Sequence, residues 1–186
     1  MRVIAGTARR LQLKTPKGLQ TRPTTDRIKE TLFNMIQDEI YGSIFVDLYA
    51  GSGGIGIESL SRGAKKCFFA ENANEPYECI QENLKFTKLN EKAEVLKMDA
   101  IDALKQIENR TQHIDVIFLD PPYLKDEEKR VLTHLASSNI IDNDTLIIVE
   151  ASIKTEFQYI SELGFTMEKC KTYGSNAHFF LRKKDS

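Results

Sequence analysis

Tryptophan is absent from the 186 residues, and cysteine and histidine occur only three times each. The cysteines, at positions 67, 79 and 170, stand far apart. This distribution provides neither an even disulfide set nor the spacing of a metal site, so we expect free thiols. The histidines are equally scattered, without a HExxH or paired pattern, and we therefore expect no metal in the protein's chemistry.

Long apolar runs are also missing. No stretch approaches the roughly 18 residues that suggest a membrane span, and the first residues, Met1 to Gly6, contain no signal-peptide core. With 41% hydrophobic and 28% charged residues, the chain has the composition of a globular domain. We expect a cytoplasmic monomer that makes no contact with a membrane.

Charge is unevenly distributed along the chain. The net charge is only −1, but residues 1–30 contain eight Lys or Arg against two acids, a balance of +6, which leaves −7 on the remainder. A basic arm on a mildly acidic body is typical of an enzyme with a phosphate-binding edge. A merely solvated basic segment remains the alternative.

The first forty residues differ in pattern from the rest. Apolar and polar residues alternate over 2–5 and 11–14, which predicts a small hairpin or two extended pieces. After a Pro- and Gly-containing break, a helix is expected to open at Thr25 or Asp26, with Ile28, Leu32, Met35 and Ile36 along its buried face. We expect residues 1–40 to form a basic extension, a hairpin plus a helix, packed on a core of residues 41–186.

From residue 44 onward, apolar strands alternate with amphipathic helices. Strands are predicted at 44–49, 66–71, 93–97, 116–120 and 145–150, and helices at 54–62, 74–88, 101–107 and 126–136. The segments 165–172 and 178–182 flank a strong turn signal at 173–176 and predict a terminal hairpin. Together these elements predict an α/β, Rossmann-like, doubly wound, mostly parallel sheet with a C-terminal antiparallel hairpin.

A glycine-rich loop follows the first predicted strand. Gly51, Gly53 and Gly56 match GxGxxG, and Glu71 ends the next strand where its carboxylate could accept two ribose hydroxyls. Taken alone, this pattern also fits a nicotinamide dinucleotide. Asp47, at the strand tip, favours a ligand with a cationic amino group, which is present in S-adenosylmethionine and absent from NAD. Asp99 could hydrogen-bond an adenine edge or cap the next helix.

The sequence Asp120-Pro121-Pro122-Tyr123 ends the very apolar strand 116–119. An aromatic exocyclic amine is a poor nucleophile, because its lone pair is delocalised into the ring. Hydrogen bonds from this amine to the Asp120 carboxylate and the Pro121 carbonyl would aim the lone pair at a methyl donor. Proline rings fix the backbone, and Tyr123 can stack on an extruded base. A solvent-facing turn is the alternative interpretation.

These residues resemble the class I S-adenosylmethionine-dependent methyltransferases, and among them the RsmD-type ribosomal RNA guanine-N2 methyltransferases. The most specific block runs from Leu19 to Asn34, and 47–56, 60–64 and 120–123 follow at the family's spacing. Many amino methyltransferases have Asn where this chain has Asp120. Ribosomal guanine-N2 enzymes of this type show Asp as well, which favours an RNA guanine without excluding DNA.

The resemblance implies S-adenosylmethionine as methyl donor, S-adenosylhomocysteine as product, and a guanine N2 amine of 16S ribosomal RNA, within the small (30S) subunit, as target. The implied donor-binding residues are Asp47, Tyr49, Gly51, Ser52, Gly53, Glu71, Asp99 and Ala100. The implied substrate-binding residues are Arg9, Arg10, Arg22, Thr24, Thr25 and Arg27, and the catalytic ones are Asp120, Pro121, Pro122 and Tyr123.

Three other functions stay open at this point. A DNA amino-methyltransferase acting on adenine N6 or cytosine N4 fits the tetrapeptide, although 186 residues leave little room for a target-recognition domain. An NAD-dependent oxidoreductase fits the loop but leaves the tetrapeptide unused. A non-enzymatic RNA-binding module leaves both Asp47 and Asp120 without a role. The sequence does not assign roles to Glu150, Ser152 or the turn at 173–176, which reach the substrate only if the strand order is as expected.

Overall fold

A seven-stranded sheet of order β3-β2-β1-β4-β5-β7-β6 forms the centre of the molecule. The computed structural model describes residues 1–16, 25–122 and 126–184. Strands β1 to β5 run parallel, while β7 is antiparallel to both β5 and β6. This confirms the predicted α/β sheet and its C-terminal antiparallel hairpin. The strands are β1 (Ile44–Leu48), β2 (Lys66–Ala70), β3 (Ala93–Leu96), β4 (Val116–Leu119), β5 (Leu146–Ser152), β6 (Phe165–Tyr173) and β7 (Asn176–Lys183).

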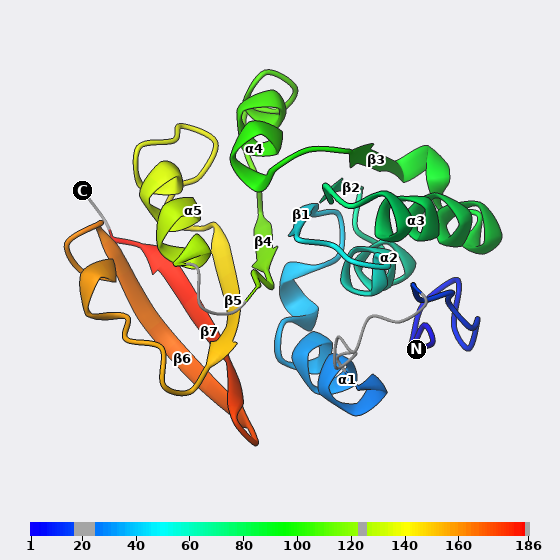
Figure 1. Cartoon of the computed structure of the whole chain (residues 1–186), viewed down its shortest axis with the longest axis horizontal. Coiled ribbons are helices and arrows are strands. Elements are labelled where there is room, and N and C mark those ends of the chain that lie inside the picture. Colours follow the sequence, from blue (N-terminus) through cyan, green and yellow to red (C-terminus); the bar gives the residue numbers. More distant parts are fainter. Residues whose placement is uncertain (17–24, 123–125, 185–186) are drawn as a thin grey trace.

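Helices cover both faces of the sheet (Figure 1). One face carries α1, α2 and α3, and the other carries α4 and α5. The α-helices are α1 (Asp26–Met35), α2 (Gly54–Ser61), α3 (Asn74–Thr87), α4 (Ala100–Glu108) and α5 (Glu127–Ala136). Short 3-10 turns lie at η1 (Gln37–Glu39), η2 (Asn90–Lys92) and η3 (Gln158–Ile160). No helix in the described ranges is long and apolar enough to cross a membrane.

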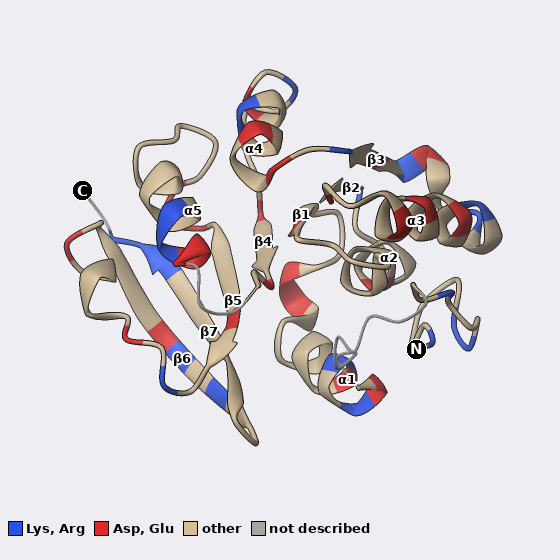
Figure 2. Cartoon of the chain, viewed as in Figure 1, with Lys and Arg blue, Asp and Glu red and all other residues tan. Residues whose placement is uncertain are grey.

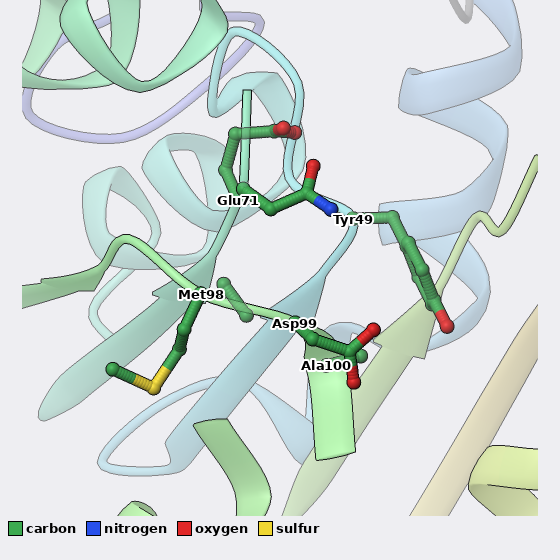
Figure 3. A pocket seen from close by; sticks show the side chains of 7 residues that line it. Tyr49, Glu71, Met98, Asp99 and Ala100 are labelled. Atoms are coloured by element: carbon green, nitrogen blue, oxygen red, sulfur yellow. The ribbon is translucent and has the colours of Figure 1, made fainter. Parts of the chain in front are cut away.

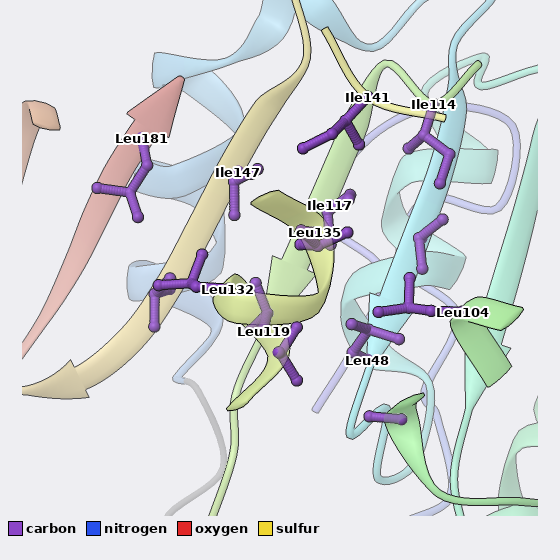
Figure 4. Packing of buried hydrophobic residues seen from close by; sticks show 14 of the residues in the cluster. Leu48, Leu104, Ile114, Ile117, Leu119, Leu132, Leu135, Ile141, Ile147 and Leu181 are labelled. Atoms are coloured by element: carbon purple, nitrogen blue, oxygen red, sulfur yellow. The ribbon is translucent and has the colours of Figure 1, made fainter. Parts of the chain in front are cut away.

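Each face of the sheet has its own hydrophobic cluster, because side chains alternate between the faces along every strand. On the α4 and α5 side, Leu48, Ile117 and Ile147 of three neighbouring strands pack against Leu104 of α4 and Leu132 of α5 (Figure 4). The central strands are therefore buried on both faces, which explains why their sequences are almost continuously apolar.

The predicted element bounds agree with the structure to within about two residues. The hairpin turn lies at residues 174–175, between β6 and β7, with Gly174 at φ +61°. All three cysteines are free, as expected. The N-terminal segment is less regular than a full hairpin: it contains one antiparallel bridge, between Arg2 and Gln12.

The N-terminal segment, residues 1–16, is fastened to α2. Glu58 accepts hydrogen bonds from the backbone N–H groups of Ile4 and Ala5 at 2.8 and 3.0 Å. Ser61 accepts from Thr7 through its carbonyl and from Ala8 through its hydroxyl. The same segment carries Lys and Arg side chains, as Figure 2 shows. A basic stretch of chain is thus held against the helix that follows the glycine loop.

Helix α1 begins where the sequence predicted, because the Thr25 hydroxyl accepts from the N–H of Ile28 at 3.4 Å. Of its expected apolar face, Leu32 and Ile36 are buried, whereas Ile28 and Met35 are half-buried. Lys29 is fully buried as well, which was not predicted from the sequence. Its Nζ lies 3.3 Å from Glu58 Oε2 and donates to the Arg2 carbonyl at 2.6 Å, so α1, α2 and the N-terminal segment meet at one buried ion pair.

Candidate active site at the carboxyl edge of the sheet

The glycine loop joins β1 to α2 through residues with positive φ. Gly51 has φ +55°, Gly53 has φ +80°, and Tyr49 adopts φ +60° although it has a side chain. Glycine takes this conformation without a Cβ clash, whereas Tyr49 is strained and must be held by its surroundings. The Gly53 N–H donates to the Ala50 carbonyl at 2.8 Å. The loop therefore turns tightly and directs the start of α2 toward the strand edge.

Asp47 lies beneath this loop, almost without solvent contact at 2% exposure. Its Oδ2 accepts a hydrogen bond from the Gly56 N–H at 2.9 Å. Burial raises the pKa of Asp47 from its ordinary 3.8 to about 7, the Gly56 hydrogen bond opposes this, and the nearby Glu71 adds to it. The ionised carboxylate is poorly stabilised in the free protein, so a cation brought to the loop would stabilise it.

Glu71 follows β2 and lies between the glycine loop and a pocket at the same edge of the sheet. Its Oε2 accepts from the Gly51 N–H at 3.0 Å, and its Oε1 accepts from the Ala73 N–H at 2.9 Å. A pocket opens beside it, as Figure 3 shows. The lining residues are Tyr49, Ala70, Glu71, Asn72, Met98, Asp99 and Ala100. Four of the predicted donor-binding residues thus lie together in one hollow.

Two side chains of α5 contact residues that line this pocket. Asp99 caps α4 by accepting from the Ile101 N–H at 3.0 Å, and its Oδ1 lies 3.3 Å from Arg130 Nη2. Arg130 also lies 3.3 Å from Glu127, which in turn accepts from the Tyr49 hydroxyl at 3.0 Å. Both interpretations of Asp99 are therefore compatible: it caps a helix and lines the pocket. The ion pair between Glu127 and Arg130 was not predicted from the sequence.

Asn83 of α3 is a second connection that sequence reasoning missed. Its side-chain amide donates to the Ser52 carbonyl in the glycine loop at 3.0 Å. The same side chain donates to the Lys14 carbonyl and accepts from the Lys14 N–H, at 3.0 and 2.8 Å. Asn83 is only 2% exposed. It therefore ties the N-terminal segment to the backbone of the loop, an arrangement that no local sequence signal reveals.

The tetrapeptide lies beside the glycine loop because β4 pairs with β1. The Asp120 N–H faces the Leu48 carbonyl at 3.5 Å, Pro121 is buried and Pro122 is exposed. Tyr123 lies outside the described residues. Burial first, and then the charges of Glu150 and Asp47, hold the pKa of Asp120 well above its usual range. The sheet order therefore brings the predicted catalytic acid next to the predicted donor loop.

The predicted substrate-binding residues have more diverse surroundings. Arg9, Arg10 and Arg27 are exposed, and no acidic side chain in the described part of the chain forms an ion pair with them. Thr25 is exposed but serves as the α1 cap. Arg22 and Thr24 lie outside the described residues. Within the described ranges, no three His, Cys, Asp or Glu side chains are grouped as a metal site.

The model of the family described as "Conserved hypothetical protein 95" matches residues 1–182. The chain belongs to this family. YlbH of Bacillus subtilis (strain 168) is 37% identical over 185 residues, which span 99% of this chain and 100% of YlbH. Ribosomal RNA small subunit methyltransferase D of Haemophilus influenzae is 38% identical over 177 residues, 94% of this chain and 89% of that protein. The solved structure of yhhF from Escherichia coli matches with a TM-score of 0.85 at 27% identity, covering 100% of this chain and 99% of yhhF.

These relatives confirm the resemblance to the RsmD-type family. The family match includes the basic N-terminal extension, the glycine loop and the tetrapeptide in one continuous range. The yhhF comparison extends over the whole fold, so the sheet order that joins the loop to Asp120 is shared with that structure.

Proposed function

We propose that this protein transfers a methyl group from S-adenosylmethionine to the N2 amine of a guanine in 16S ribosomal RNA, within the assembled or assembling small subunit. One observation carries the proposal: β4 pairs with β1, which places Asp120-Pro121-Pro122 beside a glycine loop that ends over a buried acid. The relative named ribosomal RNA small subunit methyltransferase D supports the reaction class and the substrate.

The charges around the loop suit a cationic methyl donor. Asp47, Glu71 and Asp120 form no ion pair with any Lys or Arg in the described ranges, and two of these acids have raised pKa values. A ligand that carries an ammonium and a sulfonium offsets the cost of burying these carboxylates. The bound donor supplies an electrophilic methyl group. The same acids would repel the pyrophosphate of NAD, which makes the oxidoreductase alternative the weaker one.

Each predicted donor-binding residue then has a distinct role. Asp47 would face the ammonium, and the loop from Gly51 to Gly53, including Ser52, would present its backbone to the amino-acid part of the donor. Glu71 would exchange its contact with the Gly51 N–H for the ribose hydroxyls. Asp99 and Ala100 would border the adenine, and Tyr49, which lines the same pocket, would form another part of its wall.

At the target, Asp120 and the Pro121 carbonyl accept the two N–H groups of the guanine amine, which pyramidalises the nitrogen. As the N–C bond forms and the S–C bond breaks, the amine acquires a positive charge. Asp120 takes the released proton and passes it to solvent. The raised pKa of Asp120 makes it a better proton acceptor than an ordinary carboxylate, provided that it is ionised, and the positive charge of the donor favours that state.

Residues 1–40 act in this proposal as an RNA-facing extension packed on a methyltransferase domain of residues 41–186. Arg9, Arg10 and Arg27, with Arg22 and Thr24, would contact phosphates or the target nucleotide, and Tyr123 would stack on the extruded base. Thr25 is already engaged as a helix cap, so its contribution is to position Arg27. The partner is the ribosomal subunit, and we propose that the protein acts on it as a monomer.

The proposal is tested by supplying labelled S-adenosylmethionine to the enzyme with unmodified small subunits, naked 16S RNA or duplex DNA. The methylated nucleosides are then identified by chromatography and mass spectrometry. We expect label in N2-methylguanine, with small subunits as the best substrate. Label in N6-methyladenine, in N4-methylcytosine or in DNA alone would contradict the proposal.

A further inference from the structure

Three polar side chains stand in a row across the sheet next to the tetrapeptide. In β4 and β5, Leu119 is paired with Val149, so the residues that follow, Asp120 and Glu150, are neighbours at the carboxyl edge. Glu150 is in turn paired with His178 of β7. The row therefore extends from the predicted catalytic acid toward the C-terminal hairpin, away from the donor pocket.

Glu150 and His178 form a buried pair. The His178 Nε2 lies 3.1 Å from Glu150 Oε2, and the side chains are 0% and 13% exposed. With an ionised carboxylate, Nε2 carries the proton and donates, which leaves Nδ1 as an acceptor. The ring of His178 is fixed by edge contacts with Phe118 and Tyr173, with centroids 5.8 and 5.0 Å apart. His178 thereby holds the Glu150 carboxylate in a fixed orientation.

Two buried polar atoms in or next to this row have no hydrogen-bond partner among the residues that the structure describes. These are the Nδ1 of His178 and the hydroxyl of Tyr173. Buried polar groups are almost always hydrogen-bonded, so an unpartnered pair beside a predicted catalytic acid indicates a place where a polar ligand belongs. Ser152, which also lies on β5, does not belong to this group of unpartnered atoms, because its hydroxyl accepts a hydrogen bond from the Lys154 N–H.

Resting on the proposed function, we propose that Glu150 accepts the N1–H of the target guanine and thereby determines the base specificity. Asp120 accepts an N2 hydrogen, and N1–H is the adjacent donor on the same edge of guanine. At the corresponding ring position, adenine and cytosine present a lone pair instead. A carboxylate there attracts guanine and repels the other two bases. His178 is the positioning residue that holds Glu150 in this orientation.

The test exchanges N1–H for a lone pair. The modified guanine is first located with the wild-type enzyme, and 16S RNA is then assembled with 2-aminopurine at that position, which keeps the N2 amine and lacks N1–H. We expect the wild type to prefer guanine by about 100-fold or more in kcat/KM. Glu150→Gln, whose amide can donate to the lone pair, should reduce this ratio to about 10-fold or less by gaining activity on 2-aminopurine.

His178 is tested through the same ratio. His178→Phe keeps a ring but removes the donor to Glu150, and we expect it to weaken the preference for guanine. His178→Gln, whose amide can still donate, should restore the preference. Since His178 is buried, folding of each variant is verified by urea denaturation. Donor affinity, measured by calorimetry, should be unchanged in Glu150→Gln, because β4 separates Glu150 on β5 from the donor loop after β1.

Glu168→Gln is the matched control. Glu168 is an exposed acid on β6 that pairs with Arg182 at 3.2 Å, and its substitution should leave the ratio at the wild-type value. The inference is overturned if Glu150→Gln retains the wild-type ratio of guanine to 2-aminopurine, even with a lower absolute rate. If the wild type labels adenine or no base at all, the proposed function fails first, and the inference fails with it.

Discussion

The two halves of the candidate site differ in how completely their polar groups are paired. In the donor half, which comprises Asp47, the loop 49–53, Glu71 and Asp99, each carboxylate already accepts a backbone N–H. In the target half, which comprises Asp120, Glu150, His178 and Tyr173, two buried polar atoms have no partner within the described part of the chain. The carboxylates of the donor half are therefore held by the protein itself, whereas the target half leaves the His178 Nδ1 and the Tyr173 hydroxyl without a described protein partner.

This difference has a physical reason. The donor half is built from turns and helix starts, where backbone N–H groups are available to bind carboxylates. The target half is built from neighbouring strands whose N–H groups are used in the sheet, so its side chains must rely on each other or on substrate. Mutations should accordingly separate donor binding from methyl transfer.

The largest effect is expected at Asp120. Asp120→Ala removes the acceptor that orients the target amine, and turnover should fall by about 10²–10³-fold or more while donor affinity changes little. Single-turnover assays with small subunits and calorimetry with the donor measure the two quantities. Asp120→Asn is the matched variant, since its amide oxygen still accepts a hydrogen bond, and it should retain far more activity than alanine. A parallel loss of donor affinity in Asp120→Ala would show that the two halves are not separable.

Asp47→Asn should mainly weaken donor binding, in contrast to Asp120→Ala, which should mainly slow methyl transfer. The variant keeps the acceptor for the Gly56 N–H but loses the charge that faces the donor ammonium, so donor affinity should fall by about 10- to 100-fold. At the same time, the free protein should become more stable at pH 8. Burial raises the pKa of Asp47 from 3.8 to about 7, so between pH 3.8 and about pH 7 the folded chain retains a proton that the unfolded chain has released.

The direction of the pH dependence of stability follows from this difference in bound protons. Between pH 3.8 and about pH 7 the wild type loses stability as the pH rises, because the folded state binds more protons than the unfolded state. Asn does not titrate, so the stability advantage of Asp47→Asn should grow from pH 5.5 to pH 8, to on the order of a few kcal/mol. Urea denaturation at both pH values measures it. A constant difference between the two proteins would mean that Asp47 is ionised throughout.

The same contrast separates what the sequence could predict from what it could not. Hydrophobic periodicity and turn residues are local signals, and they predicted the sheet class, the strands and helices and the glycine loop with bounds close to those observed. Asn83 bridges Ser52 and Lys14 across 31 and 69 residues, and His178 reaches Glu150 across 28. Such contacts depend on strand order and register, which periodicity does not encode. Lys29 was missed for the same reason, because its burial depends on the distant Glu58.

The smallest effect is expected outside both halves, on the N-terminal segment. Arg9→Ala with Arg10→Ala removes two exposed cations, and affinity for the small subunit should fall only several-fold at physiological salt. The plot of log affinity against log salt should become shallower by about 1 to 2. Filter binding over a range of salt concentrations measures the slope. Lys85→Ala with Lys105→Ala removes the same charge from the last turns of α3 and α4, outside the N-terminal segment, and should leave the slope unchanged. Equal slopes for the two double variants would mean that the segment contributes only general charge and does not contact phosphate.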